Sequence, residues 1–238
     1  LEQARNETAS DAAAILAPLD EAAAKWLDTP VGHLDVPLLP EDHIVMAEFG
    51  SGIANFFNQV QLDASGADVS CTSLGNEVKG FQQDITVRDV VATYIYPNTL
   101  DTLLVNRAVL KAALERCAQY FALRPDGTLE VSQDFLKPKV EHYNYDYFAG
   151  IQVTMDIRNP VGSRVTSIRY QGQELPEGRE LTLCMNNYRS SGTGGYPCFR
   201  DCPKVRQQQT EISELIMDYV LERGSITVDK TKWLTVLY

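Results

Sequence analysis

Residues 151–158, Ile-Gln-Val-Thr-Met-Asp-Ile-Arg, alternate between apolar and polar side chains along their whole length. Successive side chains of a strand point to opposite faces, so this alternation predicts a half-buried β-strand. Residues 164–170 and 180–186 predict two further strands. Turn signals separate them at Gln171-Gly172 and at Pro176-Glu177-Gly178. The sheet that decides the fold is therefore expected in this part of the chain.

Helical patterns lie on both sides of these strands. Residues 107–121 predict a helix that Asn106 can cap, with an apolar face made of Leu110, Ala113, Leu114, Cys117 and Phe121. Residues 205–223 predict a second helix that ends at Gly224, and its inward side chains are Ile212, Leu215, Ile216, Tyr219 and Val220. Residues 52–62 predict a third helix, residues 67–72 a short buried strand, and residues 226–237 one or two closing strands.

Less regular patterns fill the rest of the chain. Alanine-rich residues 8–28 predict a helix that begins at a capping box formed by Thr8 and Asp11 and that Pro18 breaks or kinks. Residues 29–45 contain several prolines and no period, which predicts an extended connector. Residues 85–94 mix strand and helix signals, and residues 124–150 are irregular, so they are either functional or wrapped on the core.

Helices and hairpin-connected strands are mixed without a regular βαβ repeat. This order favours an α+β fold, a mixed β-sheet with packed helices, over a doubly wound sheet. We divide the chain into residues 1–40, an N-terminal helix with its connector, and a main domain over residues 41–238.

The net charge of −11 argues against partners that attract basic surfaces. Nucleic-acid polymers and anionic membranes are such partners, whereas a small nucleotide can still bind a locally positive pocket. No apolar run in the sequence approaches the ~20 residues that span a bilayer. The composition therefore leaves small-molecule chemistry open.

Cysteine and histidine offer little chemistry of their own. Cys117 and Cys184 lie in apolar patterns and are expected in the core, whereas Cys198 and Cys202 could pair, bind a metal or stay free. His33 and His43 match no metal-site spacing, so we expect surface loops there, and we assign no metal ligand or catalytic residue. His142 opens the aromatic stretch 142–148, which lines a pocket or covers the core; we favour the covering role.

Two loops carry the strongest binding signal. Residues 185–199, Met-Asn-Asn-Tyr-Arg-Ser-Ser-Gly-Thr-Gly-Gly-Tyr-Pro-Cys-Phe, follow an apolar strand and combine glycines, tyrosines and an arginine. Glycine allows a close approach of a ligand, tyrosine offers a face for stacking, and arginine suits an anion. Residues 94–100, Tyr-Ile-Tyr-Pro-Asn-Thr-Leu, have a similar character, so the loops could form two walls of one slot. A plain hairpin turn is the alternative for the glycine loop.

Three segments together resemble the C-terminal domain of the 5′-nucleotidase family, and most of all its 2′,3′-cyclic-nucleotide 2′-phosphodiesterase branch. The first runs from Asp84-Ile85-Thr86 to Tyr94–Leu100, and the second is Tyr143-Asn144-Tyr145-Asp146 followed by Gly150-Ile151. The third runs from Gly162-Ser163-Arg164 to the Asn186-Asn187-Tyr188-Arg189 loop. The resemblance spans about residues 45–224.

The resemblance implies a division of labour between two domains. A separate N-terminal metallophosphatase domain of the same polypeptide would hold two divalent metal ions and hydrolyse the phosphoester, so this chain alone would have no cofactor and no activity. This domain would recognise a nucleoside or nucleotide, its base stacked between Tyr96 and Tyr188. The residues implied around the base are Asn98, Asn187, Arg189, Ser191, Gly192 and Gly194. Members of the family are often periplasmic, secreted or attached to the cell wall.

The sequence also departs from the family pattern. Many 5′-nucleotidases have Asn-Gly-Gly-Gly-Ile-Arg after the strand near residue 71, where this chain has Thr-Ser-Leu-Gly-Asn-Glu at 72–77 and so lacks the arginine. Gly194 replaces an acid that is common in the second glycine loop. Both departures fit the cyclic-phosphodiesterase branch. A stand-alone binding module and a structural domain whose glycine loop is a simple turn remain as alternatives.

Overall fold

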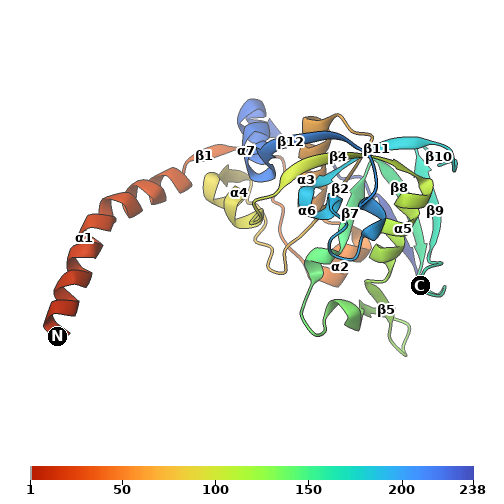
Figure 1. Ribbon diagram of the computed structural model, residues 1–238, viewed down its shortest axis with the longest axis horizontal. Helices are drawn as coiled ribbons and strands as arrows, with labels where there is room; N and C mark the ends of the chain where they lie inside the picture. Colours follow the sequence, from red (N-terminus) through yellow and green to blue (C-terminus); the bar gives the residue numbers. More distant parts are fainter. Residues whose placement is uncertain (1) are drawn as a thin grey trace.

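The computed structural model describes the backbone of residues 2–238 and the side chains of residues 14–238. A five-stranded mixed sheet forms its centre, in the order β12 (Lys204–Glu211), β4 (Thr99–Asn106), β11 (Glu180–Asn186), β2 (Val69–Ser73) and β7 (Asp146–Ala149). β11 runs antiparallel to β4 and parallel to β2, and β7 runs antiparallel to β2. Helices lie on both sides of this sheet (Figure 1). The α+β class expected from the sequence is confirmed.

A four-stranded sheet packs beside the central one. Its order is β10 (Gln173–Glu174), β9 (Val165–Tyr170), β8 (Ile151–Asp156) and β14 (Leu234–Leu237). The strand predicted from the alternating residues 151–158 is confirmed in β8, whose Ile151, Val153 and Met155 are buried. Helix α5 (Arg107–Ala118) contacts both β4 and β9, so the two sheets and α5 share one hydrophobic core. Asn106 caps α5 as predicted, since its Oδ1 accepts a hydrogen bond from the Val109 amide at 3.1 Å.

A second core lies on the other face of the central sheet. Helix α3 (Gly52–Ser65) packs on β2 and β11, and α7 (Ile212–Arg223) packs on α3. Around them lie α4 (Val87–Thr93) and a small sheet with the order β13 (Ser225–Ile226), β1 (Pro30–Leu34) and β3 (Asp84–Thr86). The phenyl rings of Phe56, Phe57 and Phe81 pack edge-on in this core. Gly224 ends α7 at φ 67°, in the left-handed region that glycine favours.

Shorter elements complete the body. Helix α2 (His43–Phe49) precedes α3, and a ribbon of β5 (Phe121–Leu123) and β6 (Leu129–Val131) follows α5. Helix α6 (Asn187–Ser190) directly follows β11. Single 3₁₀ turns cover Gln133–Phe135, His142–Asn144 and Pro197–Phe199.

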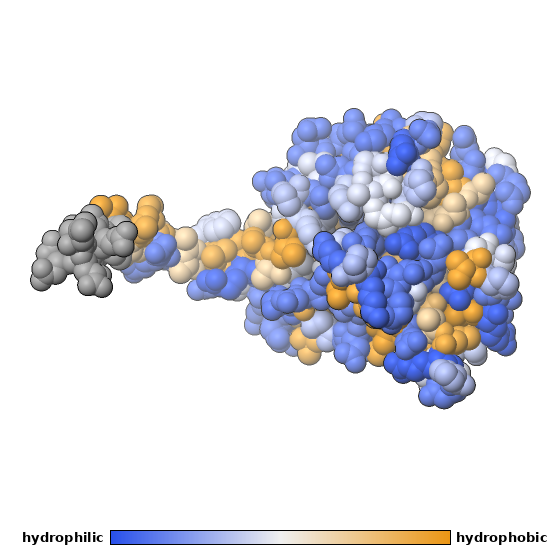
Figure 2. All heavy atoms as spheres, turned by 60° about the horizontal axis from the view of Figure 1, so that its bottom comes forward, coloured by the Kyte–Doolittle hydropathy of each residue, from blue (hydrophilic) through white to orange (hydrophobic). Residues whose placement is uncertain are grey.

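Helix α1 (Glu2–Leu27) projects from the body as a long arm (Figure 1). It continues through Pro18, so of the break or kink predicted there the break is wrong. The arm reaches the body at its C-terminal end, where Arg88 Nε of α4 lies 2.9 Å from Oδ1 of Asp28, the residue that follows α1. Apolar and polar side chains are mixed along the described part of the arm, residues 14–27 (Figure 2), and Ile15, Leu19 and Trp26 are more than half exposed. The capping box expected at Thr8 and Asp11 lies outside the described side chains.

Within the helices that the structure describes, none combines the length and the apolar character required to cross a membrane.

Two further sequence predictions are wrong. Residues 204–211, which fall almost entirely within the helix predicted over 205–223, form the edge strand β12, paired with β4 alone and mostly exposed. An exposed edge strand carries polar side chains on both faces, so the apolar alternation that marks a strand is missing. The extended connector predicted over 29–45 is also wrong, because β1 pairs with β3 and β13, Leu34 and Leu38 are buried, and α2 begins at His43.

The cysteines lie where their neighbours suggest. Cys117 and Cys184 are buried, as predicted, and Cys71 is buried as well. Cys198 and Cys202 are half-buried and free, and the Cys202 thiol donates to the Cys198 carbonyl at 3.3 Å. No disulfide joins the two in this structure.

Candidate functional site

The sheet topology brings both predicted binding loops to one edge of the central sheet. β4 begins at Thr99 and β11 ends at Asn186, and Leu100 pairs with Asn186 because the two strands are antiparallel. The loop that precedes β4 and the loop that follows β11 are therefore neighbours. A hydrogen bond joins them directly, from the Thr99 amide to Asn187 Oδ1 at 3.2 Å.

Two further segments reach the same edge. β2 runs parallel to β11, so its end at Ser73 lies at this edge too. β7 is antiparallel to β2 and pairs Asp146 with Ser73, which places the residues before β7 beside the two loops. Part of the irregular segment 124–150 thus belongs to the site.

These four segments enclose an open cleft of about 290 Å³. Ligand pockets of proteins start at about this size. Tyr96 and Tyr188 both line the cleft, with 37% and 42% of their surfaces exposed. The other lining residues are Ser73, Asn98, Lys139, Tyr143 and Asn186. Three tyrosine rings with hydroxyl, amide and ammonium groups around them suit a flat, polar small molecule.

Sequence reasoning found Tyr96, Asn98 and Tyr188 but missed the other lining residues. Tyr143 belongs to a stretch that is predicted to cover the core, and the stretch does both: Tyr145 is buried while Tyr143 faces the cleft. Asn186 stands next to the glycine loop, and its side chain also accepts the Arg189 amide at 2.7 Å. No local sequence pattern around Lys139 indicates that it lines a binding site.

Arg189 does not face the cleft. Its side chain is 1% exposed, and its Nε lies 2.8 Å from Asp146 Oδ2. Its other nitrogens donate to the carbonyl of Thr193 at 2.7 Å and to the carbonyl of Tyr143 at 3.0 Å. Burial acts to lower the pKa of Arg189, but the Asp146 carboxylate outweighs it and raises the pKa, so the guanidinium stays charged. In this conformation Arg189 ties the glycine loop to β7.

The remaining residues expected around a ligand form the loop itself. Ser191 Oγ donates to the Tyr188 carbonyl at 2.7 Å, and Asn187 bonds the neighbouring loop through its side chain. Gly192 and Gly194 have φ of 85° and 76°, values that glycine adopts without strain. A side chain at 194 would overlap Arg189 Nη1 and Asn144 Oδ1. The loop conformation therefore depends on glycine at this position.

The cleft has a distinct electrostatic character. Burial, followed by the neighbouring Tyr143, raises the pKa of Tyr96 above its usual range, so its hydroxyl stays protonated at neutral pH. The hydrogen bond to Tyr143 raises the pKa of Lys139, whose Nζ lies 3.0 Å from the Tyr143 hydroxyl oxygen. Among the described side chains that line the cleft, Lys139 is the one charged group.

Two histidines stack on each other, and one of them, His142, lies in the segment that precedes β7. The rings of His43 and His142 are 3.9 Å apart and nearly parallel, at 12°. His142 Nδ1 lies 2.6 Å from the Tyr120 hydroxyl, and Asn76 Oδ1 accepts the His142 amide at 3.0 Å. Burial, and then His43, lowers the pKa of His142 to about 4. His33 lies apart from them and contacts Asp84 at 2.8 Å.

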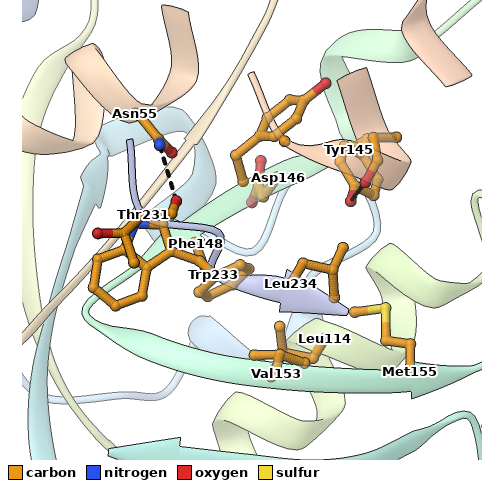
Figure 3. Close-up of a pocket in the computed structure, with 13 residues that line it drawn as sticks. Asn55, Leu114, Tyr145, Asp146, Phe148, Val153, Met155, Thr231, Trp233 and Leu234 are labelled. Carbon is orange, nitrogen blue, oxygen red and sulfur yellow. Dashed lines mark hydrogen bonds between the residues drawn. The ribbon is translucent and has the colours of Figure 1, made fainter. Parts of the chain in front are cut away.

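A separate cavity behind the sheet is too small for a nucleoside. Its volume is about 40 Å³, whereas benzene occupies a cavity of about 150 Å³. Figure 3 shows Leu114, Val153, Met155 and Leu234 along its wall, with Asn55 Nδ2 donating to the Thr231 carbonyl at 3.1 Å at one side. We place the candidate site in the tyrosine cleft because it gathers three tyrosine rings, two asparagine side chains and one ammonium group.

Across the side chains that the structure describes, no group of three or more His, Cys, Asp or Glu is arranged to hold a metal ion.

Fold and cleft together define an α+β domain with an aromatic, polar-lined site of small-molecule size at one edge of its central sheet. The profile of the family described as "5′-nucleotidase, C-terminal domain" matches residues 30–201. The chain belongs to this family, as its motifs indicated.

Relatives with known names agree with the family. The chain is 25% identical over 240 residues to the 2′,3′-cyclic-nucleotide 2′-phosphodiesterase/3′-nucleotidase of Haemophilus influenzae, covering 87% of this chain and 36% of that protein. It is 26% identical over 155 residues to the trifunctional nucleotide phosphoesterase protein YfkN of Bacillus subtilis, covering 60% of this chain and 10% of that protein.

Solved structures show the same fold. A putative 5′-nucleotidase from Staphylococcus aureus, in complex with alpha-ketoglutarate, superimposes with a TM-score of 0.82 at 35% identity, covering 92% of this chain and 42% of that one. A 5′-nucleotidase precursor from Thermus thermophilus superimposes with a TM-score of 0.75 at 18% identity, covering 93% and 42%. The chain thus spans less than half the length of these relatives. It is a domain of a family of nucleotide-processing hydrolases.

Proposed function

We propose that this domain is the substrate-recognition part of a phosphoesterase that acts on 2′,3′-cyclic nucleotides, nucleoside monophosphates or both. The cleft between Tyr96 and Tyr188 would hold the base, with the sugar and phosphate directed out of its open side. The observation that carries the proposal is that these two tyrosines, 92 positions apart in the sequence, line one cleft with their rings partly exposed.

Partly exposed aromatic walls suit the stacking of a base. Each stacked base gains about 1–3 kcal/mol from an aromatic side chain. Asn98 and Asn186 add amide groups that can both donate and accept, which suits the mixed edge of a nucleobase. The hydroxyl of Ser73 offers one more polar contact at the end of β2.

The hydrolytic step would take place in a metallophosphatase domain of the same polypeptide, which supplies a two-metal centre. This domain would contribute binding energy and orientation. Holding the base and the sugar in a fixed position brings the phosphorus to the reacting groups and lowers the entropic part of the barrier. The proposed partners are therefore a small nucleotide or nucleoside and the catalytic domain.

Ligand titration of this chain tests the proposal. We expect adenosine and nucleoside monophosphates to bind, and Tyr96→Ala or Tyr188→Ala to weaken binding by about 1–3 kcal/mol each, or roughly 5- to 150-fold. Tyr238→Ala is the matched control, because Tyr238 is similarly exposed, contacts Glu48, and does not line the cleft.

The outcome separates the proposal from its alternatives. Equal binding by wild type and both cleft variants would remove the stacking role. A structural or interaction domain predicts no nucleoside binding at all. A stand-alone binding module predicts the same binding as our proposal, and differs in having no catalytic domain encoded beside it.

A further inference from the structure

Lys139 is a cationic side chain in the tyrosine cleft that the function proposed above does not use. It lies in the segment before β7, and its Nζ is 3.0 Å from the Tyr143 hydroxyl oxygen and 5.3 Å from the centroid of the Tyr143 ring. Both residues line the cleft together with Tyr96 and Tyr188. The ammonium group thus shares the cleft with the tyrosines that are proposed to stack the base.

Arg189, the cation that the sequence predicts at the site, is not free to bind an anion. The side chain of Arg189 is 1% exposed and its charge is compensated by Asp146 at 2.8 Å. The arginine that the family pattern places near residue 77 is absent as well. Among the described residues that line the cleft, Lys139 carries the positive charge and no carboxylate opposes it.

The nearby acid does not cancel Lys139 by direct pairing. The carboxylate of Glu141 accepts the Tyr143 hydroxyl at 3.3 Å and Asn144 Nδ2 at 2.9 Å. Within the described side chains Lys139 forms no ion pair with a carboxylate. Glu141 thus orients the tyrosine beside Lys139.

The backbone around Lys139 is held in place. Asn76 Nδ2 donates to the Val140 carbonyl at 2.9 Å, and Asn76 Oδ1 accepts the His142 amide at 3.0 Å. This side-chain clamp fixes two backbone positions that follow Lys139. A fixed backbone limits the conformational entropy that the segment loses when a ligand binds.

We propose that Lys139 is a specificity-determining residue that binds the anionic phosphate of the ligand, so that this domain itself prefers nucleotides to uncharged nucleosides. On a chain with a net charge of −11, an anion gains this attraction at a local cation that is not paired directly with a carboxylate. A lysine acts here as a point charge, which suits a phosphate in more than one orientation. The inference rests on the proposed function, because the tyrosines must hold the base.

The test compares adenosine, 3′-AMP and 5′-AMP on wild type, Lys139→Met, Lys139→Arg and Lys137→Met. We expect wild type to bind at least one of the nucleotides about 5- to 10-fold more tightly than adenosine, as for a partly exposed charge-assisted contact. The preference should fall to about 1 in Lys139→Met, persist in Lys139→Arg, and weaken in wild type as salt rises. Lys137→Met removes the same charge from an exposed neighbour outside the cleft lining and should keep the preference.

Titration with inorganic phosphate is a second test of the anion site, and it does not depend on binding of the base. It should shift the Tyr143 ring resonances of wild type in NMR spectra and leave those of Lys139→Met unchanged. Two outcomes would overturn the role of Lys139 and leave the proposed function standing. The nucleotide preference could survive in Lys139→Met, or wild type could bind adenosine through the tyrosines and show no preference for a nucleotide. Absence of any adenosine binding overturns the proposed function. The titration with inorganic phosphate then decides whether the anion site exists.

Discussion

Gly194 offers the sharpest test of how the glycine loop is held together. Its φ is 76°, and a β-carbon there would overlap Arg189 Nη1 and Asn144 Oδ1, with Asn144 Cγ 3.1 Å away. Gly194→Ala must therefore displace the Arg189 side chain or move the loop. Because Arg189 and Asp146 are both buried, either movement disturbs a charge pair that has no access to water.

The expected loss has two parts. Alanine at positive φ costs about 1 kcal/mol relative to glycine. Breaking a buried ion pair by removing or displacing one partner costs about 3–5 kcal/mol. Since the loop can yield part of the way, we expect Gly194→Ala to lower the free energy of unfolding by about 3–5 kcal/mol in total.

Gly162→Ala is the matched control. Gly162 has φ 87°, similar to Gly194, but nothing lies within 4 Å of the position that a β-carbon would take there. This variant should lose about 1 kcal/mol, the backbone cost alone. Urea unfolding of both variants, followed by circular dichroism, measures the midpoints and slopes from which the losses are obtained. Equal losses for the two variants would refute the argument that Arg189 fills the space beside Gly194.

Three further predictions concern other parts of the molecule. The pKa of His142 is lowered to about 4 from an ordinary value of 6.5, by burial and by His43, so the unfolded chain takes up the proton first as the pH falls. The free energy of unfolding should thus be unaffected by this group above pH 6.5 and fall by about 1 kcal/mol between pH 6.5 and 4, a figure reduced for the half-exposed ring; His142→Asn should remove this part of a measured pH–stability profile. Asn106→Ala should cost about 1 kcal/mol in chemical denaturation, because it removes the cap of α5, and an unchanged midpoint would argue against the cap. The chain alone, with Mn²⁺ or Zn²⁺ and bis-nitrophenyl phosphate, should show no turnover above background, and turnover that survives purification would contradict a catalytic centre located in another domain.

Local sequence patterns predicted the elements whose stability is local. Helix α5 carries its own cap at Asn106 and an apolar face, and β8 carries its own alternation. Helix α7 was predicted with the correct buried face and end, but the preceding strand β12 was merged into it. β12 exists because β4 offers a free edge, and that information lies about a hundred residues away in the sequence.

Local patterns also marked the aromatic walls of the cleft but not its other lining residues. Tyr96 and Tyr188 stand beside proline, asparagine and glycine turns, which mark loops, so each loop could be recognised by itself. Ser73 and Lys139 reach the cleft because β2 ends and β7 begins at the same edge, which only the strand order reveals. The burial of Arg189 depends on Asp146, 43 positions earlier, and no local pattern pairs the two.

The central claim is that the two tyrosines hold a base between them. Its most direct measurement is an NMR titration of the chain with adenosine, in which the ring resonances of assigned tyrosines and the base protons are followed together. We predict saturable shifts of Tyr96 and Tyr188, upfield movement of the base protons from ring stacking, and little change at Tyr238. Binding that shifts neither cleft tyrosine, or no binding at millimolar adenosine, would contradict the account.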